Sequence, residues 1–122
     1  MNELTITLDH PDAAFTPGGR IAGKVEWRLA AAPDAMELRL VWYTEGKGTQ
    51  DAEIVQTVRY DHPIAADSHT FELTAPVGPH SFSGTLISLL WALELVTDSE
   101  DHATRQPIVI APAGKEIELH SA

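Results

Sequence analysis

The sequence predicts an all-β sandwich of seven to nine antiparallel strands. Apolar and polar residues alternate in short runs along most of the chain, and glycine and proline separate these runs at regular intervals. Short strands with evenly spaced turns are typical of sandwich folds. The 122 residues fit a single domain, residues 1–122, which is large enough to bury a core without a disulfide or a metal ion.

In the first half of the chain we expect strands over residues 2–8, 21–29, 36–43 and 52–60. The pattern is clearest from Ile21 to Leu29, where every second residue is apolar or glycine and its neighbours are mostly charged. In the fourth of these strands, Ile54, Val58 and Tyr60 are expected on one face. A half-buried strand has this period of two residues.

In the second half we expect strands over residues 70–74, 85–97, 108–110 and 116–120. The stretch 85–97 is almost entirely apolar, so its periodicity also allows a buried helix. The unbroken alternate row from Ile87 through Trp91 to Leu95 favours a strand, as do the strands predicted on both sides.

Turns are expected at Gly46–Thr49, Asp61–Pro63 and Asp98–His102, with a proline-rich corner at Pro76–Gly84. Pro17-Gly18 suits a type II turn, because glycine accepts a positive φ at its third position. Glycine inside a strand indicates a bulge or a close backbone approach, and Gly23 is such a residue.

The net charge of the chain limits the classes of partner that it can bind. Eighteen acidic residues against eight basic ones give a net charge of −10, which repels phosphate backbones and anionic lipid. We therefore expect no nucleic-acid partner. The acidic charge first indicates solubility, and the alternative is a patch that binds a basic partner.

The sequence also predicts a cytoplasmic protein. It has no cysteine, which excludes disulfides and thiol catalysis and fits a reducing compartment. Residues 1–6 show no signal-peptide pattern. The longest apolar stretch, Leu86–Val96, is too short to span a bilayer as a helix, so no integral membrane segment is expected.

The histidines do not predict a metal site. His62, His69, His80 and His102 are expected in turns or at strand ends, and their spacing matches no metal-binding motif. The acidic run Asp98–His102 lacks the length and the central glycine of a calcium loop, so an acidic hairpin turn is the simpler interpretation.

No catalytic pattern is present either. His80 and Ser81 are adjacent, so their side chains point apart and do not form a nucleophile and its base, and no Gly-x-Ser-x-Gly elbow occurs. Gly46–Thr49 lacks the upstream glycine of a phosphate loop. We therefore predict no catalytic, cofactor-binding or metal residues, no cofactor and no enzymatic activity.

Large aromatic residues leave two interpretations open. Trp27, Trp42 and Trp91 are expected in the core or at its edge. If they are exposed together with Tyr43, they would instead form an aromatic surface. The alternative function is therefore a small-ligand or carbohydrate-binding β-sandwich.

Two segments together resemble the N-terminal domain of arrestin-like proteins. The first, Phe15–Val25, has an aromatic residue before Pro-Gly and then a strand with an x-Gly-x-Val step. The second contains Phe71-Glu72-Leu73, then Pro79–Gly84, then the strand with Ile87 and Trp91. The order and separation of these motifs match the family over nearly the whole chain, and its bacterial sporulation-control-like branch is the closest analogy.

This resemblance implies an immunoglobulin-like, arrestin-like sandwich with a non-catalytic scaffold or adaptor role, exercised through protein–protein contacts. It implies no phosphate recognition, because the first strand, Asn2–Leu8, lacks the basic residues with which visual-type arrestins sense phosphate. The expected partner is a protein of unidentified kind, bound at a strand edge or a sheet face. Self-association into a homodimer is a further expectation, since it would recreate the paired sandwiches of arrestins.

Overall fold

The computed structural model describes residues 2–10, 12–46, 50–83, 87–100, 102–112 and 117–118. This part of the chain contains seven strands of six or more residues and three strands of two residues. The strands are β1 (Glu3–Leu8), β2 (Ala14–Phe15), β3 (Arg20–Arg28), β4 (Ala35–Gly46), β5 (Ala52–Asp61), β6 (Ala66–Thr74), β7 (Phe82–Ser83), β8 (Ile87–Thr97), β9 (Ala103–Ile110) and β10 (Ile117–Glu118).

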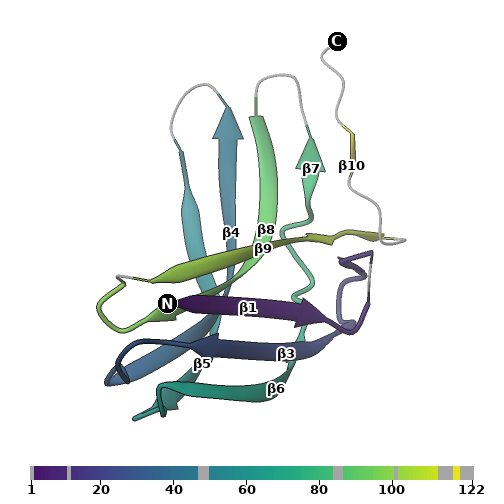
Figure 1. Cartoon of the computed structure of the whole chain (residues 1–122). Coiled ribbons are helices and arrows are strands. Elements are labelled where there is room, and N and C mark those ends of the chain that lie inside the picture. The colour runs from purple at the N-terminus through teal and green to yellow at the C-terminus, as the bar shows by residue number, and fades with distance from the viewer. Residues whose placement is uncertain are drawn as a thin grey trace.

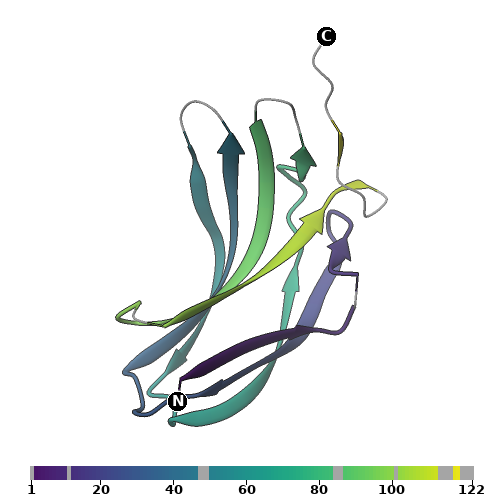
Figure 2. The ribbon, with the colours of Figure 1, turned by 45° about the horizontal axis from the view of Figure 1, so that its top comes forward.

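The strands form two layers (Figures 1 and 2). The smaller sheet has the order β1-β3-β6, and the larger one has the order β10-β7-β8-β4-β5, with β9 also on β8 and β2 on β9. All pairings between the seven long strands are antiparallel. Of the three two-residue pairings, β2 with β9 and β7 with β10 are parallel, and β7 with β8 is antiparallel. The predicted all-β sandwich is confirmed.

The core lies between the two layers and follows the predicted alternation. The strand interpretation of residues 85–97 is confirmed from Ile87 onward, and the alternate residues Leu89, Trp91, Leu93 and Leu95 are buried. The other core side chains from the long strands are Ile6, Ile21, Val25, Trp27, Met36, Leu38, Leu40, Phe71, Leu73, Ile108 and Ile110. Each large apolar side chain buried here contributes roughly 1.5–3 kcal/mol.

The larger sheet projects beyond the smaller one. Figure 1 shows the end of β4, the start of β5, the start of β8 and β7 rising above β1, β3 and β6, and Figure 2 shows the same from a second direction. The start of β5 therefore lies on the projecting end of the larger sheet.

The expected type II turn is confirmed at Thr16–Gly19. The N–H of Gly19 donates to the carbonyl of Thr16 at 2.9 Å, and Gly18 has a φ of 78°. Gly23 is a close approach and not a bulge, because the β1–β3 and β3–β6 registers run without a shift. A Cβ at Gly23 would overlap the carbonyl oxygen of Thr7 and lie 3.1 Å from the ring of Phe71.

One predicted face is wrong because β5 contains a bulge. The register between β4 and β5 shifts between Leu40 and Val41, and Val55 is the extra residue. Val58 is opposite Leu38, a core residue, whereas Ile54 is opposite Val41. Ile54 therefore lies on the opposite face of the sheet from Val58, and the predicted row of Ile54, Val58 and Tyr60 does not exist.

Some strand bounds also differ from those predicted. β6 begins at Ala66 instead of Thr70, and β9 begins at Ala103 instead of Ile108. Both extensions carry polar residues on exposed positions, which weakens the apolar signal. Parts of the predicted turns, of the strand 85–97 and of the last strand, at residues 47–49, 84–86, 101, 116, 119 and 120, lie outside the described residues.

Candidate interaction surface

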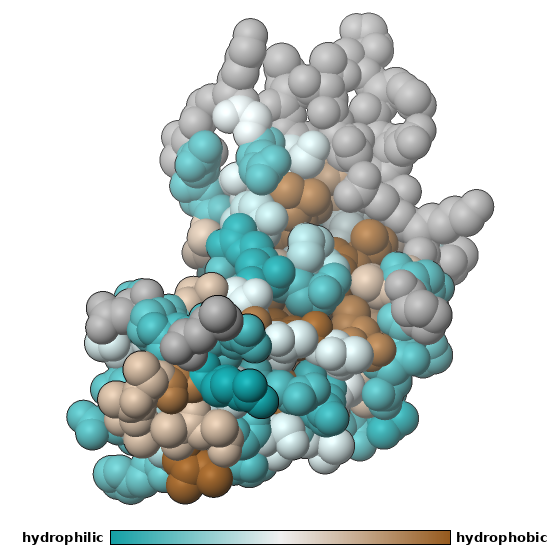
Figure 3. Space-filling model, in the orientation of Figure 1, coloured by the Kyte–Doolittle hydropathy of each residue, from teal (hydrophilic) through white to brown (hydrophobic). Residues whose placement is uncertain are grey.

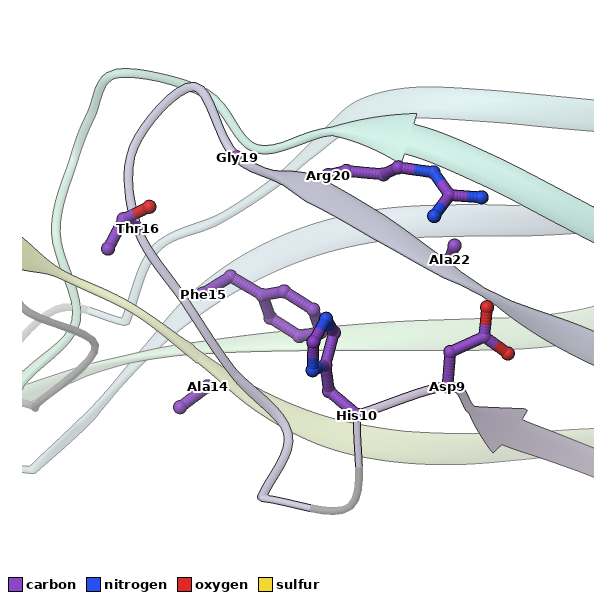
Figure 4. A pocket seen from close by; sticks show the side chains of 8 residues that line it. All are labelled: Asp9, His10, Ala14, Phe15, Thr16, Gly19, Arg20 and Ala22. Carbon is purple, nitrogen blue, oxygen red and sulfur yellow. The ribbon is translucent and has the colours of Figure 1, made fainter.

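A polar hollow of about 440 Å³ lies beside the end of β1, β2 and the start of β3 (Figure 4). Asp9, His10, Phe15, Thr16 and Arg20 are among its lining residues. The His10 ring meets the Phe15 ring edge-on at 6.1 Å. The Arg20 guanidinium lies 2.8 Å from the carboxylate of Glu72, and both side chains are largely exposed. This hollow presents polar groups to solvent.

The polar hollow contains no assembled catalytic pair. Nucleophilic catalysis requires a nucleophile within hydrogen-bond reach of its base. In the described part of the chain, neither Asp9 nor His10 forms a side-chain hydrogen bond with another side chain of this hollow. The outer face of the smaller sheet, which continues from the hollow, is also mostly hydrophilic over β1, β3 and β6 (Figure 3).

Ser81 serves the fold. It is buried, its Oγ accepts a hydrogen bond from the Ile110 N–H at 3.0 Å, and its own N–H donates to the Ile110 carbonyl at 2.8 Å. The adjacent His80 ring nitrogen pairs instead with the Val77 carbonyl at 3.0 Å. The two side chains thus have separate backbone partners, as the sequence predicts.

The described histidines do not form a metal site. Among the residues that the structure describes, no group of three or more His, Asp or Glu side chains could hold a metal ion. His62 lies in the turn after β5, whereas His69 lies inside β6, which corrects its expected place at a strand end. The His69 ring stacks on Trp27 and Tyr60 at 5.3 and 5.0 Å, and its Nε2 is 3.1 Å from Asp67.

The acidic turn between β8 and β9 is tied to the sheet. Glu100, with a φ of 60°, bonds the Arg39 guanidinium at 2.9 Å, and the Asp98 N–H donates to the Ala35 carbonyl at 3.0 Å. Partial burial lowers the pKa of Arg39, but its bonds to Glu100 and Glu37 outweigh burial and raise that pKa above its ordinary value. These contacts identify a charge-paired hairpin turn.

The aromatic residues divide between core and surface. Trp27 and Trp91 are 3% and 1% exposed, and their ring N–H groups donate to the carbonyls of Ile64 and Pro79, each at 2.8 Å. Trp42 is half-buried against the core. The core interpretation of the tryptophans is confirmed, so of the four aromatics only Trp42 and Tyr43 retain exposed surface.

A second hollow, mostly apolar and about 280 Å³ in volume, crosses the outer face of the larger sheet. Its lining includes Val41 and Tyr43 from β4, and Ile54 from β5. On the β8–β9 side, Arg105 bonds Glu94 and stands over the Tyr43 ring at 4.5 Å from the centroid. The hydrogen bond to Glu94 raises the pKa of Arg105 above its ordinary value. The hollow thus has an apolar floor and one charge-paired wall.

The opposite wall of this apolar hollow is the edge strand β5. In the described structure β5 pairs with β4 and with no strand on its other side. Its first four residues, Ala52–Val55, are all exposed. Ile54 is 52% and Val55 38% exposed, which is unusual for large apolar side chains that sit next to each other. The sequence analysis did not predict this pair, because it placed Ile54 on the same face as Val58 and Tyr60.

Carboxylates cluster around the same end of β5. Glu45, Asp51 and Glu53 are exposed and form no ion pair with a described residue. Farther along the sheet the charges are paired, since Glu37 binds both Arg39 and Arg59. The start of β5 is therefore apolar, and the three carboxylates around it have no ionic partner among the described residues.

Comparisons with known proteins support the fold. No family model and no curated protein match the chain. A solved structure of Spo0M, a sporulation control protein from Bacillus subtilis, matches with a TM-score of 0.64 and 15% sequence identity, over 90% of this chain and 49% of that one. This chain spans about half the length of that neighbour. The likeness is consistent with the arrestin-like fold that the sequence motifs imply.

Proposed function

We propose that this chain is a non-catalytic protein–protein interaction module with a scaffold or adaptor role. The observation that carries the proposal is a sandwich that presents an unpaired strand edge with exposed apolar side chains beside an apolar hollow. Such edges bind extended segments of other proteins through main-chain hydrogen bonds, with side-chain pockets adding specificity.

The residues that chemistry would use serve structural roles in this fold. Ser81 ties β9 to the loop before β7, and the acidic turn pairs with Arg39. The description of the neighbour as a sporulation control protein also fits a regulatory module. The described residues include no helix with the length and apolar character needed to cross a bilayer. We place the module in the cytoplasm, where a protein without cysteine meets no redox constraint.

The carbohydrate-binding alternative has less support. A sugar ring needs an open aromatic face, and Trp27 and Trp91 offer none. One face of Tyr43 is covered by Arg105. The apolar hollow, at about 280 Å³, lies at the small end of the roughly 300–1,000 Å³ of ordinary small-molecule sites.

Affinity capture tests the proposal. The purified chain is immobilised and exposed to an extract of its source cells, and an unrelated acidic sandwich domain of equal net charge serves as the control. We expect the chain, and not the control, to retain a small set of proteins in near-stoichiometric amounts. If every protein retained by the chain is retained equally by the control, the proposed function is wrong.

A further inference from the structure

Three strand edges of the sandwich differ in what they expose. On β1 the exposed residues include Glu3, Thr5 and Thr7, and its apolar side chains turn inward. On β6 the residues Ser68 to Thr70 are polar and exposed. The start of β5 alone, among the edges of the described long strands, exposes large apolar side chains, at Ile54 and Val55.

The bulge divides β5 into two different edges. Beyond it, Gln56 donates to the Thr74 carbonyl of β6 at 2.8 Å, and Arg59 is paired with Asp61 and Glu37. These contacts hold the second part of β5 against its neighbours. Before the bulge, Ala52–Val55 forms no side-chain hydrogen bond or ion pair with a described residue, and it lies on the projecting end of the larger sheet (Figure 1).

The apolar hollow sits directly beside this free edge. Val41, which is opposite Ile54, and Tyr43, which is opposite Ala52, contribute to its floor. A strand added to β5 would point every second side chain toward the same face as this hollow. Its volume of about 280 Å³ accommodates one or two apolar side chains of such a strand.

The charges around the edge indicate which kind of segment binds there. Glu45, Asp51 and Glu53 surround the start of β5 without ionic partners among the described residues. Basic side chains on the bound segment would neutralise them. A second copy of this chain would bring the same three carboxylates to the shared edge, and the resulting repulsion disfavours it.

We propose that the edge Ala52–Val55, together with the apolar hollow beside it, binds an extended segment of a partner protein in which apolar and basic residues alternate. This inference rests on the proposed function and specifies its binding edge and the chemistry of its partner. The bound segment extends the larger sheet by one strand, its apolar side chains cover Ile54, and its basic side chains face Glu53 and Asp51.

The test uses a ten-residue peptide in which lysine and isoleucine alternate, titrated into the isotope-labelled full chain and followed by NMR. We expect saturable shifts concentrated in the amides of residues 52–55, Val41 and Tyr43. A peptide with glutamate in place of lysine should bind at least about tenfold more weakly. Glu53→Lys and Ile54→Ser should each weaken lysine-peptide binding by about tenfold or more.

Matched control variants lie away from this edge. Glu3→Lys reverses an exposed carboxylate on β1, and Ile64→Ser removes an isoleucine that is 62% exposed between β5 and β6. Both should bind the lysine peptide as the original chain does. All four positions are exposed, so folding is expected to survive, and the amide spectra verify it.

Three results would overturn the proposal: no binding of the lysine peptide at millimolar concentration, shifts centred on β1 or β6, or a dimer of this chain held together through residues 52–55. A further experiment distinguishes failure of this binding edge from failure of the proposed function. If a captured protein binds the chain that carries both Glu53→Lys and Ile54→Ser as tightly as the original, the edge is wrong while the interaction role stands.

Discussion

The guanidinium carbon of Arg105 on β9 lies 4.5 Å from the centre of the Tyr43 ring on β4. The same guanidinium bonds the Glu94 carboxylate at 2.5 and 2.9 Å. One side chain thus links β9, β8 and β4 across the outer face of the larger sheet. This contact fixes the wall of the apolar hollow and covers one face of the aromatic ring.

Arg105→Ala removes both contacts, and we expect it to lower the free energy of unfolding by about 1 kcal/mol, the sum expected for an exposed ion pair and a cation–π contact. Urea denaturation measures the change. Lys24→Ala is the comparison, because the Lys24 side chain is as exposed as that of Arg105 and its ion pair with Glu26, at 3.4 Å, has no described ring beneath it. Equal effects of the two substitutions would show that the ring contact contributes nothing.

Gly23→Ala should destabilise the fold by roughly 3 kcal/mol or prevent folding, because the new methyl group overlaps the backbone of β1. Thermal unfolding followed by circular dichroism measures the loss. Gly78→Ala is the matched control, since a Cβ there meets no atom within 4 Å. A Gly23→Ala variant as stable as the original would refute the close approach of β1 and β3.

Ser81→Ala should cost about 1–3 kcal/mol, because it leaves the buried N–H of Ile110 without its acceptor. Ser68→Ala, at an exposed position of β6, should change stability by less than about 0.5 kcal/mol. The structural role further predicts that Ser81→Ala binds partners with unchanged affinity. Loss of partner binding by a folded Ser81→Ala variant would contradict that role.

Tyr60→Phe should raise the free energy of unfolding by about 1 kcal/mol, because the buried Tyr60 hydroxyl has no hydrogen-bond partner among the described residues. Urea denaturation near neutral pH measures the gain. The comparison is Tyr43→Phe, which should bring no such gain, because the Tyr43 hydroxyl has a hydrogen-bond partner in Arg105. A Tyr60→Phe variant less stable than the original would show that the hydroxyl has a favourable partner.

Tyr60 also predicts a pH dependence. Burial raises the pKa of Tyr60 above its ordinary value of 10.0, so the folded chain holds this proton more tightly than the unfolded chain does. The stability associated with Tyr60 is complete below pH 10 and is lost as the pH rises through the folded pKa. Above pH 10, the free energy of unfolding should therefore fall more in the original chain than in the Tyr60→Phe variant. Denaturation at several pH values measures both. If the two proteins lost the same free energy of unfolding over this pH range, the raised pKa of Tyr60 would be contradicted.

The fold could be predicted from sequence because its signal is local. The alternate row from Leu89 to Leu95 encodes a buried strand, and Thr16–Gly19 encodes its turn through the positive φ of Gly18. The bulge at Val55 could not be predicted, because the extra residue does not disturb the alternation of apolar and polar residues in the sequence of β5. It becomes visible only in the pairing with β4, where it places the residues before it on the opposite face of the sheet.

The proposed binding edge could not be predicted from the sequence for the same reason. Isoleucine is a residue type that is usually buried, and only the shift in register places Ile54 on the outer face beside Val41. The polar starts of β6 and β9 were likewise missed because edge positions carry little apolar signal. In contrast, the pairing of carboxylates with arginines depends on folded geometry that sequence spacing does not encode.

Hydrogen–deuterium exchange tests the central claim most directly. The chain is measured free and with the protein recovered by affinity capture, and the amides of each strand edge are compared. The account predicts protection at residues 52–55 of β5 and little change along β1 and β6. Protection confined to β1, to β6 or to the polar hollow at Asp9 and Arg20 would contradict it.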